Sequence, residues 1–467
     1  MDVAVSQFAQ DRIVAGDSGL LLVSDNYDAF AARILAARSA TRSLDLMYYL
    51  WHNDHTGRVL MQEVVRAAER GVRVRILLDD INPQNSDAAY LALDAHPNIE
   101  LKLFNPSGAR NGSPFRAVEL VFRLFAMTRR MHNKALIADD SVAIVGGRNV
   151  GDAYFDAAET NFRDLDLLLV GPAVEQTSRI FNSFWESGAS RGIASLHPGD
   201  RSVVDAGFIS NIDSAQDVAL LSGIADLDTL AQTIATGRGF HWVKNASVIS
   251  DPPEKVRGRK TRSWLMHELL PVLQSAKESL EIASPYFIPG RKGLAILSDL
   301  AAKGVEVSVL TNSLAATDVA TVHGAYANYR KRLLRAGIKL YELQPFRHQA
   351  KISVFGSKGA SLHTKAFTVD GKTGFVGSFN FDPRSVSLNA EMGVLFQDER
   401  LTAEIRRLFQ NEIQPQTSYS VGLRDGRLVW TGVDQGQMHQ YRREPEASLS
   451  RRILAMLVRH LPIESQL

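Results

Sequence analysis

Segments with the apolar spacing of amphipathic helices alternate along the chain with short, almost wholly apolar runs that are typical of buried strands. In the first part of the chain, the helical spacing occurs at residues 25–38 and 57–70, and the strand pattern at 43–51, 71–78 and 98–104. Strands that alternate with helices predict a mostly parallel sheet with helices on both faces.

The same order of elements recurs in the second part of the chain. Three strand patterns follow those of the first part at a nearly constant distance, at residues 279–286, 304–310 and 337–341. This predicts a duplicated domain, with a first copy in residues 1–200 and a connecting segment plus second copy in residues 201–467. We interpret residues 188–262 as a connection that crosses the surface. Its basic run at 255–262 is more typical of a solvated face than of a phosphate or headgroup contact.

The most specific signal is a polar motif that occurs twice. The first copy reads HNKALIADDSVAIVGGRN and the second reads HTKAFTVDGKTGFVGSFN. Both have His, any residue, Lys, four residues, Asp, six residues, and then a glycine-led segment that ends in Asn. The motif positions are His132, Lys134, Asp139 and Asn149 in the first copy, and His363, Lys365, Asp370 and Asn380 in the second.

Each motif copy predicts a β-hairpin, because two short apolar runs flank a turn that starts at its aspartate. Side chains two apart on a strand share a face, so the histidine and lysine point the same way, and the hairpin brings the asparagine back towards them. An imidazole, an ammonium and an amide on one patch form a phosphate site, where the histidine can attack or donate a proton. Asp139 and Asp370, at the turns, are expected to brace a loop or pair with a neighbour rather than touch the substrate.

Composition narrows the classes of protein that fit. The chain has 467 residues, of which 45% are hydrophobic and 22% charged, as in soluble globular proteins, and its net charge of +2 gives no general attraction to nucleic acid. Since the chain contains no cysteine, disulfides and cysteine-based metal sites or nucleophiles are excluded. The N-terminus has no signal-peptide pattern, and no apolar run reaches the ~18 residues of a spanning helix, so any membrane contact is expected to be peripheral.

The paired motif resembles that of the phospholipase D superfamily, in which two-copy members carry one motif in each half. Four wider stretches resemble bacterial cardiolipin synthases of the C-type branch, and the resemblance covers nearly the whole chain. These stretches are residues 146–155, 311–334, 356–365 and 377–393. One departure is Gly146-Gly147 in the first copy, where the second has Gly377-Ser378. If the serine hydroxyl helps to hold phosphate, the first half does so less.

The resemblance implies an α/β fold with two pseudo-symmetric phospholipase D-like domains, each a mixed, mostly parallel sheet flanked by helices. It also implies a phosphatidyltransferase that makes cardiolipin through a phosphohistidine intermediate, from phosphatidylglycerol with phosphatidylethanolamine or a second phosphatidylglycerol. No cofactor and no metal are expected, because cationic side chains already surround the phosphate. The implied setting is the periphery of the bacterial inner membrane, with phospholipids as partners and no nucleic acid; the oligomeric state stays open.

In the family, an acid on the strand after each motif hydrogen-bonds a catalytic imidazole. Asp164 is the candidate in the first half, with Asp166 on the same face as its alternative, and Glu391 is the candidate in the second. These residues could instead be strand-end acids that face water. By analogy with family members, His132 is expected to be the nucleophile and His363 the general acid, although the symmetric motif geometry does not distinguish them.

Further candidates concern substrate and membrane. Tyr286 and His323 lie just beyond predicted strand ends, where α/β sheets bind ligands, and are candidates for substrate contact; ordinary packing is the alternative. Residues 115–130 and 449–461 have the pattern of basic amphipathic helices, which lie in a membrane interface or pack on the protein's own core.

A phosphodiesterase or nuclease is the alternative function, since it would share the catalytic residues. Such a protein should also show a basic groove with stacking aromatics. A non-catalytic role conflicts with two intact motifs.

Overall fold

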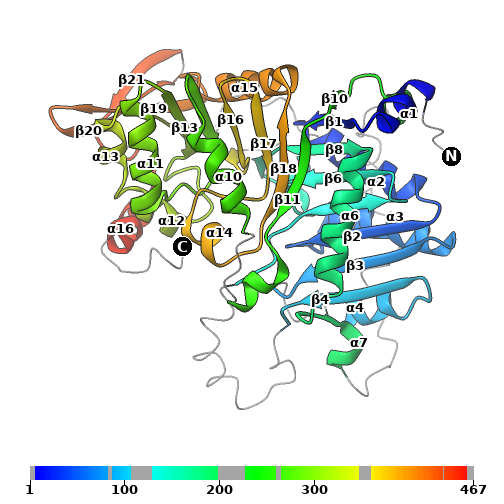
Figure 1. Ribbon diagram of the computed structural model, residues 1–467. Helices are drawn as coiled ribbons and strands as arrows, with labels where there is room; N and C mark the ends of the chain where they lie inside the picture. The colour runs from blue at the N-terminus through cyan, green and yellow to red at the C-terminus, as the bar shows by residue number, and fades with distance from the viewer. Residues whose placement is uncertain are drawn as a thin grey trace.

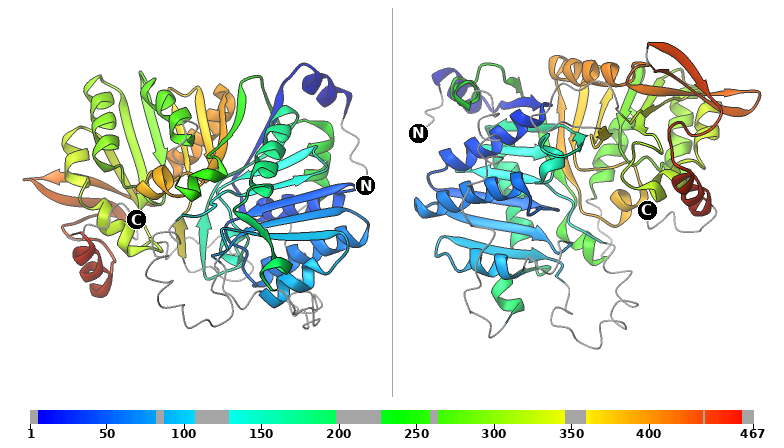
Figure 2. Two further views of the ribbon diagram at one scale, coloured as in Figure 1. Left: turned by 60° about the horizontal axis from the view of Figure 1, so that its bottom comes forward. Right: turned by 180° about the vertical axis from the view of Figure 1, so that it is seen from behind.

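The computed structural model describes residues 6–81, 87–106, 129–197, 227–258, 264–345, 359–434 and 436–459. These residues form two large β-sheets, one in each half of the chain, that lie side by side with helices packed on them (Figures 1 and 2). No helix among these residues is both long enough and apolar enough to cross a bilayer.

Among the described residues, the first sheet has nine strands. In spatial order they are β10 (His241–Val243), β1 (Ser18–Val23), β8 (Asp166–Val170), β6 (Val142–Gly146), β5 (Ala135–Ala138), β2 (Ser43–Tyr48), β3 (Arg73–Asp79), β4 (Ile99–Phe104) and β9 (Ser190–Gly192).

In the described part of the second half, the sheet has ten strands and repeats the same topology. In spatial order they are β11 (Ala246–Ser250), β18 (Met392–Gln397), β17 (Thr373–Gly377), β16 (Ala366–Val369), β12 (Ser279–Ala283), β13 (Glu306–Asn312), β14 (Lys339–Leu343), β19 (Ser418–Arg424), β20 (Arg427–Asp434) and β21 (Gln437–Tyr441). The run from β1 to β9 in the first sheet matches the run from β11 to β19 in the second, strand for strand and in the direction of every pairing. The α/β class with two similar halves is therefore confirmed.

The prediction that each sheet is mostly parallel is wrong. Among the described strands, the parallel pairs within the two large sheets are β2–β3 and β3–β4 in the first and β12–β13 and β13–β14 in the second. These pairs occur where a helical crossover connects consecutive strands, as parallel pairing requires. The motif hairpins and the strands that return beside them are antiparallel, and the sequence analysis did not count these strands when it predicted the sheet.

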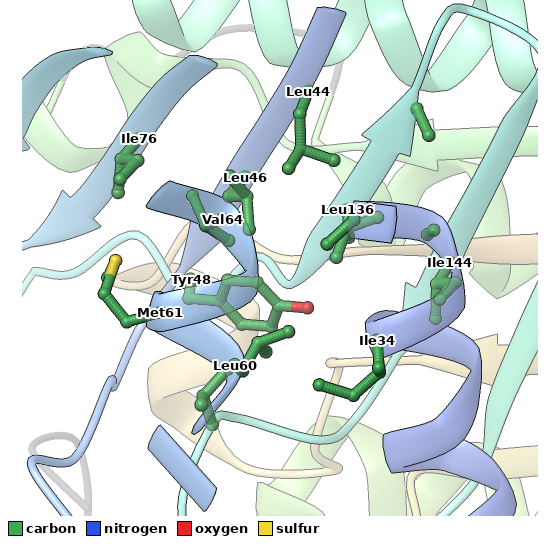
Figure 3. Close-up of a cluster of buried hydrophobic side chains, with 14 of the residues drawn as sticks. Ile34, Leu44, Leu46, Tyr48, Leu60, Met61, Val64, Ile76, Leu136 and Ile144 are labelled. Carbon is green, nitrogen blue, oxygen red and sulfur yellow. The ribbon is translucent and has the colours of Figure 1, made fainter. Parts of the chain in front are cut away.

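Helices of the first half cover one face of its sheet. Apolar residues of α2 (Asn26–Ser39), α3 (His55–Glu69) and α4 (Asp87–Asp94) pack against the strands, together with α9 (Leu227–Thr236). Figure 3 shows part of this core, where Ile34 of α2 and Leu60 of α3 approach Leu46, Tyr48 and Leu136 of the sheet. The remaining short helices of this half are α1 (Gln7–Val14), η2 (Asp152–Tyr154) and α7 (Ile193–Leu196).

The opposite face of the first sheet forms a core that both halves share. It contains α6 (Pro172–Trp185), Val145 and Leu167 of the first sheet, and Val376 and Val394 of the second, together with Leu401 of α15 (Glu399–Glu412). Burial of apolar surface therefore fixes β6 and β8 of one half against β17 and β18 of the other. The two motif hairpins are held together by this interface.

The second sheet has helices on both faces. One face packs against α10 (Leu265–Gln274), α11 (Gly290–Ala302), α12 (Ala320–Tyr326) and α13 (Arg330–Arg335), and a smaller cluster on the other face includes Phe409 of α15. The remaining elements are η3 (Pro253–Arg257), α14 (Pro383–Ser387) and α16 (Leu449–Val458), and a separate pair of strands, β7 (Thr160–Arg163) and β15 (Gly359–Leu362).

Residues 188–262, where they are described, do not simply cross the surface as the sequence analysis expected. They contribute β9 and β10 to the first sheet and β11 to the second, so the chain passes from one sheet to the other between Val243 and Ala246. The apolar residues of these short strands were too few to produce a clear pattern. The expected domain division after residue 200 lies outside the described residues and stays a prediction.

Candidate active site

Each motif occupies a hairpin whose turn is formed by its aspartate. β5 and β6 are joined at Asp139 and Asp140, with φ of 53° and 52°, and β16 and β17 at Asp370 and Gly371, with φ of 52° and 65°. Positive φ at both central residues is what a type I′ turn requires, and aspartate and glycine tolerate it.

The motif aspartates hold the loops that lead into β2 and β12, the strands that pair with β5 and β16. The Asp139 carboxylate accepts hydrogen bonds from the backbone N–H groups of Thr41, Arg42 and Ser43. Asp370 accepts the equivalent bonds from Lys277, Glu278 and Ser279. Burial raises the pKa of each carboxyl, but these bonds outweigh it, so that both pKa values are lowered. Both residues lie at the far end of β5 or β16 from the motif histidine and lysine.

The backbone that enters each motif histidine pairs with the opposite half. His132 N donates to Ala390 O, and Ala390 N donates to Arg130 O, each over 2.8 Å. In the second motif, β15 pairs in parallel with β7, and His363 N donates to Arg163 O over 2.8 Å. Each histidine is therefore placed beside the residue that immediately precedes the candidate acid of the other half.

The two histidine–carboxylate pairs are consequently crossed between the halves. Nδ1 of His132 lies 2.8 Å from Oε2 of Glu391, and Nδ1 of His363 lies 2.5 Å from Oδ2 of Asp164. Both carboxylates are buried, with 0% and 2% exposure, and so do not face water as the alternative interpretation had it. The sequence analysis proposed these acids but did not specify that each acts on the histidine of the other half.

These contacts determine which nitrogen of each neutral ring is unprotonated. An ionised carboxylate only accepts hydrogen bonds, so the proton lies on Nδ1 in both pairs, and the lone pair is left on Nε2. Nζ of Lys365 also lies 2.8 Å from Nδ1 of His363, but the 2.5 Å contact with Asp164 is the shorter of the two and sets the tautomer. The Ser378 carbonyl, 3.2 Å from Nδ1 of His132, is a second acceptor for the same proton. Among the described residues, none hydrogen-bonds to Nε2 of either ring.

The motif lysines are buried beside the histidines, each with 1% exposure. Nζ of Lys134 donates to His132 O over 2.6 Å, and Nζ of Lys365 donates to His363 O and lies 4.0 Å from Oδ2 of Asp164. Burial lowers the pKa of both ammonium groups, and the Lys365 value falls to about 8. At neutral pH, Lys365 therefore still carries the charge that would neutralise a phosphate oxygen.

Burial also lowers the pKa of both motif imidazoles. The pKa of His132 falls to about 4, because burial and the nearby Lys134 outweigh the opposing effect of Glu391. The pKa of His363 is lowered by burial and then by Lys365, and Asp164 offsets this only in part. Both rings are neutral at pH 7 in the protein alone, and the negative charge of a bound phosphodiester would raise both pKa values.

The two carboxylates remain ionised. Burial raises the pKa of Asp164, but Lys365, His363 and Arg148 outweigh it and lower the value. For Glu391, burial is outweighed by His132, by Lys134 and by the Ser378 hydroxyl. Each buried pair therefore joins a neutral ring donor to a charged acceptor.

The asparagines that end the motifs differ in their surroundings. The Asn149 amide is anchored, since Nδ2 donates to the Tyr154 hydroxyl over 2.8 Å and Oδ1 accepts from Leu50 N over 3.2 Å. Asn380 is equally buried, but its Oδ1 has no hydrogen-bond partner among the described residues. The imidazole of His363 is further packed by Tyr154 and Phe162, with ring centroids 5.2 and 4.9 Å away.

The departure of Gly147 from the serine at the equivalent position has a steric cause. A Cβ atom on Gly147 would lie 2.2 Å from Oδ1 of Asp164, so this residue must lack a side chain. In the second half, the longer Glu391 leaves room for Ser378, whose hydroxyl donates to Oε2 over 2.5 Å. The serine therefore supports an acid, whereas the sequence analysis considered it for phosphate.

Two positioning residues were missed because neither belongs to the motif. Asp79 ends β3 and accepts from Met131 N over 2.8 Å, and Asn312 ends β13 and accepts from Leu362 N over 2.9 Å. Met131 and Leu362 directly precede the motif histidines. Each is a polar residue at the end of one of two equivalent strands, and their separation along the chain matches the offset between the two repeats. This match was the signal that could have identified both residues.

The Asp251–Lys255 pair lies behind Glu391 and was also missed. Nζ of Lys255 donates to Oδ2 of Asp251 over 2.8 Å, and the same oxygen accepts from Glu391 N over 3.0 Å. Lys255 is 1% exposed and also donates to Ser385 O, while the Ser385 hydroxyl donates to Glu391. The first lysine of the basic run is therefore not on a solvated face, because it neutralises a carboxylate beneath the site.

The alternative acid, Asp166, belongs to a different network. Its Oδ2 lies 2.9 Å from Arg33 and 3.2 Å from Arg148 in the core.

Tyr286, the first of the two substrate candidates, is half-buried, and its hydroxyl donates to Asp318 over 2.7 Å. Of the helix expected at 115–130, residues 115–128 lie outside the described residues.

His323 lies in a buried polar cluster rather than beside the motif imidazoles. Nδ1 is 3.2 Å from Asn312 O, and Nε2 is 3.1 Å from Arg330 and 3.5 Å from Glu444. His323, Glu342 and Glu444 are the one group of potential metal ligands found among the described residues. The Arg330 guanidinium already pairs with both carboxylates, at 3.4 and 2.6 Å, and so takes the place that a cation would fill.

Comparison with known proteins agrees with this geometry. The family model described as "Cardiolipin synthase, PLD-like domain" matches residues 34–185 and 269–413. The chain is 39% identical to cardiolipin synthase C of Escherichia coli, over 96% of each chain, and 25% identical to a cardiolipin synthase of Staphylococcus aureus, over 90% of this chain and 72% of that one. In fold, it is similar to phosphatidylserine synthase of Haemophilus influenzae, with a TM-score of 0.62 at 14% identity over 96% and 95% of the two chains.

Proposed function

Since the chain belongs to the cardiolipin synthase family with phospholipase D-like domains, we propose that it moves a phosphatidyl group from one phospholipid to a hydroxyl of another and so forms cardiolipin. The crossed pairing of His132 with Glu391 and of His363 with Asp164 is the observation that carries this proposal, because it joins both motifs in one site. We take phosphatidylglycerol as one substrate, and phosphatidylethanolamine or a second phosphatidylglycerol as the other.

In the first step, Nε2 of His132 attacks phosphorus. A P–N bond forms, the P–O bond to the leaving alcohol breaks, and His363 donates the proton that this alcohol takes up. Glu391 stabilises the positive charge that develops on the His132 ring, as the carboxylate of a hydrolase triad does. Lys134 and Lys365 neutralise the phosphate oxygens in the transition state, with Asn149 and Asn380 beside them.

In the second step, the hydroxyl of the acceptor lipid attacks the phosphatidyl-histidine. His363, now neutral, removes the proton of that hydroxyl, the P–N bond breaks, and His132 is restored. Because the leaving alcohol departs before the acceptor attacks, one site can serve both lipids. Neutral rings in the free protein suit this order of steps. The attacking histidine needs its lone pair, and the negative charge of the bound substrate then favours protonation of the other ring.

We further propose that the protein acts at the periphery of the bacterial inner membrane, where both lipid substrates are found. Tyr286 remains our candidate for contact with a headgroup, because its hydroxyl is fixed by Asp318 and it follows the end of β12 by three residues. His323 is better explained by its buried cluster, and we do not propose it as a substrate contact.

The test is product analysis on defined lipids. Purified protein is incubated with phosphatidylglycerol alone, with phosphatidylethanolamine alone and with both, and the products are identified by mass spectrometry. Cardiolipin together with free ethanolamine or free glycerol identifies the donor. A product set of phosphatidic acid only would make the protein a hydrolase, and cleavage of single-stranded DNA without lipid transfer would favour the nuclease alternative. His132→Asn and His363→Asn variants control for contaminating activity.

A further inference from the structure

Helix α16 presents an unusually apolar surface. Nine large hydrophobic residues are exposed among the described residues, and five of them lie on this ten-residue helix. They are Leu449, Ile453, Leu454, Met456 and Leu457, with exposures between 43% and 72%. At 100° per residue they share one broad side of the helix. A water-exposed apolar side of this kind needs a partner.

The opposite side of α16 is packed tightly on the protein. Ala455 and Val458 are buried against α12, and a Cβ on Gly324 would lie 2.7 Å from Ala455 O, so the two helices are in close contact. Arg459 Nε also donates to Asn328 Oδ1 over 2.9 Å. The helix is therefore fixed with its apolar side outwards, at the edge of the second half beside α12 (Figures 1 and 2).

The charge of the helix matches an anionic surface. α16 contains no acidic residue and has Arg451 and Arg452 in its first turn. Just before it, Arg442 and Arg443 are exposed, whereas Glu444 pairs with Arg330 and Glu446 accepts from the Tyr419 hydroxyl. Ten residues give a length of about 15 Å, too short to cross a bilayer but sufficient to lie in its interface. A basic, apolar, in-plane helix binds bilayers that contain anionic lipid.

The same helix is bonded to a loop at the edge of the candidate active site. Arg451 Nη1 donates to the carbonyls of Leu314, Ala315 and Thr317, at 3.0, 3.3 and 2.7 Å. The next residue in this loop, Asp318, accepts the hydroxyl of Tyr286, our candidate for headgroup contact. A bilayer that holds α16 would therefore lie beside the loop that carries this contact.

We propose that α16 is the membrane-docking element, and that its apolar side enters the interface of an anionic bilayer and so brings the active site to its lipid substrates. The proposal rests on the lipid transfer proposed above. A second copy of this chain is the other possible occupant of the apolar side. The basic flank and the link to the active-site loop favour lipid.

The test is flotation with vesicles of phosphatidylglycerol and phosphatidylcholine. Ile453→Ser/Leu457→Ser should lower the fraction bound at least tenfold, because two exposed apolar side chains leave the interface. The matched control Val14→Ser/Met438→Ser, which changes two exposed apolar residues elsewhere, should bind like the wild type. Equal binding by the α16 variant and the wild type, or no binding by the wild type, would overturn the proposal.

A second measurement separates docking from catalysis. Transfer on short-chain phosphatidylglycerol dissolved as monomers should be within twofold of wild type in the α16 variant, whereas transfer on vesicles should fall with binding. Absence of transfer by the wild type on either substrate would contradict the proposed function, while flotation would still decide the role of α16. Light scattering checks the other occupant: a wild-type dimer that becomes a monomer in the α16 variant would assign this side to self-association and overturn the proposal.

Discussion

Asp164 and His363 belong to different halves of the chain, yet Oδ2 of the first lies 2.5 Å from Nδ1 of the second. Glu391 and His132 repeat this relationship in the opposite direction. Neither half therefore contains a complete histidine–acid pair. Two separated halves should each be inactive, and activity should appear only when they associate.

The first prediction concerns these crossed acids. Asp164→Asn and Glu391→Gln keep the shape but remove the charge, and each should lower the transfer rate by about 10²–10⁴-fold, as in hydrolase triads. If His132 is the nucleophile, a p-nitrophenyl phosphodiester, whose leaving group needs no acid, should relieve the Asp164→Asn defect and leave the Glu391→Gln defect.

Asp166→Asn is the matched control for this experiment. It changes a neighbouring buried aspartate that pairs with Arg33 and Arg148, so it should lower the melting temperature while the turnover of folded protein stays near wild type. Relief of Glu391→Gln by the better leaving group would contradict the crossed assignment if the covalent label is on His132; with the label on His363, it would instead reverse the roles of the two histidines.

The second prediction concerns the size match between the acids and the residues beside them. Gly147→Ser should lower activity about 100-fold, because its Cβ would displace the Asp164 carboxylate and with it the His363 ring. The double variant Gly147→Ser/Asp164→Glu reproduces the Ser378–Glu391 pair of the second half and should recover part of this loss. A double-mutant cycle on transfer rate measures the coupling, and additive losses would show that the two positions act independently.

Much of the fold could be predicted because local pattern and long-range structure agree. The strands expected at 43–51 and 279–286 are present as β2 and β12, and both motif hairpins form where Asp139 and Asp370 predicted turns. The sheets were mistaken for mostly parallel because hairpin strands such as β5 and β6 were analysed as motif rather than as sheet. Strand direction depends on which strands become neighbours, and the spacing of apolar residues does not contain that information.

The candidate site could be predicted as a set of residues but not as an arrangement. The repeat identified the two histidines and the resemblance identified Asp164 and Glu391, but only the packing of Val145 and Leu167 against Val376 and Val394 brings the pairs across the interface. The Asp251–Lys255 pair was missed for a similar reason. A Lys four residues after an Asp is usually a surface pair, and its burial behind Glu391 depends on residues more than 100 positions away.

The third prediction concerns Asn312, which holds the residue before His363. Asn312→Ala leaves the buried Leu362 N–H without its acceptor, and we expect a loss of roughly 1–3 kcal/mol in the free energy of unfolding together with slower transfer. Asn312→Asp keeps this acceptor, as Asp79 does in the first half, but loses the bond that Nδ2 of Asn312 donates to Leu362 O over 2.9 Å. We therefore expect it to lose stability as well, but to lose less transfer activity than Asn312→Ala. Urea denaturation and turnover number are the two measurements, with Asn411→Ala, at an exposed position of α15, as a surface control. Equal effects of Ala and Asp at position 312 on transfer would contradict this role.

The fourth prediction concerns pH. The pKa of Lys365 is lowered to about 8, so above this pH the free protein loses a charge that we assign to phosphate binding. We expect kcat/KM to fall about tenfold per pH unit above 8, since kcat/KM reports groups of the free enzyme.

Unfolding does not explain such a loss. A lysine whose pKa is lower in the folded than in the unfolded protein binds fewer protons in the folded state, so its contribution to the free energy of unfolding increases as pH rises from 8 to 10.5. Lys365→Arg, whose charge does not titrate, should remove this limb; an unchanged limb would assign it to another group.

The last prediction is the identity of the nucleophile. The geometry is nearly symmetric, since both rings are buried, both have Nδ1 on a carboxylate and both have Nε2 free of hydrogen bonds from the described residues. The two rings differ in their nearest cation, because Nζ of Lys365 lies 2.8 Å from Nδ1 of His363, whereas Nζ of Lys134 donates to the His132 carbonyl. An ammonium against a ring disfavours positive charge on that ring, and the phosphorylated ring is cationic, so we expect the covalent intermediate on His132. The test uses phosphatidylglycerol labelled in its phosphate. The protein is mixed with this lipid and quenched in alkali, where phosphohistidine survives, and a peptide that contains His132 should carry the label.

The His363→Asn variant should keep this label and accumulate it, because the second step lacks its base, whereas His132→Asn should carry none. Label on His363 would reverse the two roles, and full transfer activity in both variants without label on either would rule out the covalent mechanism.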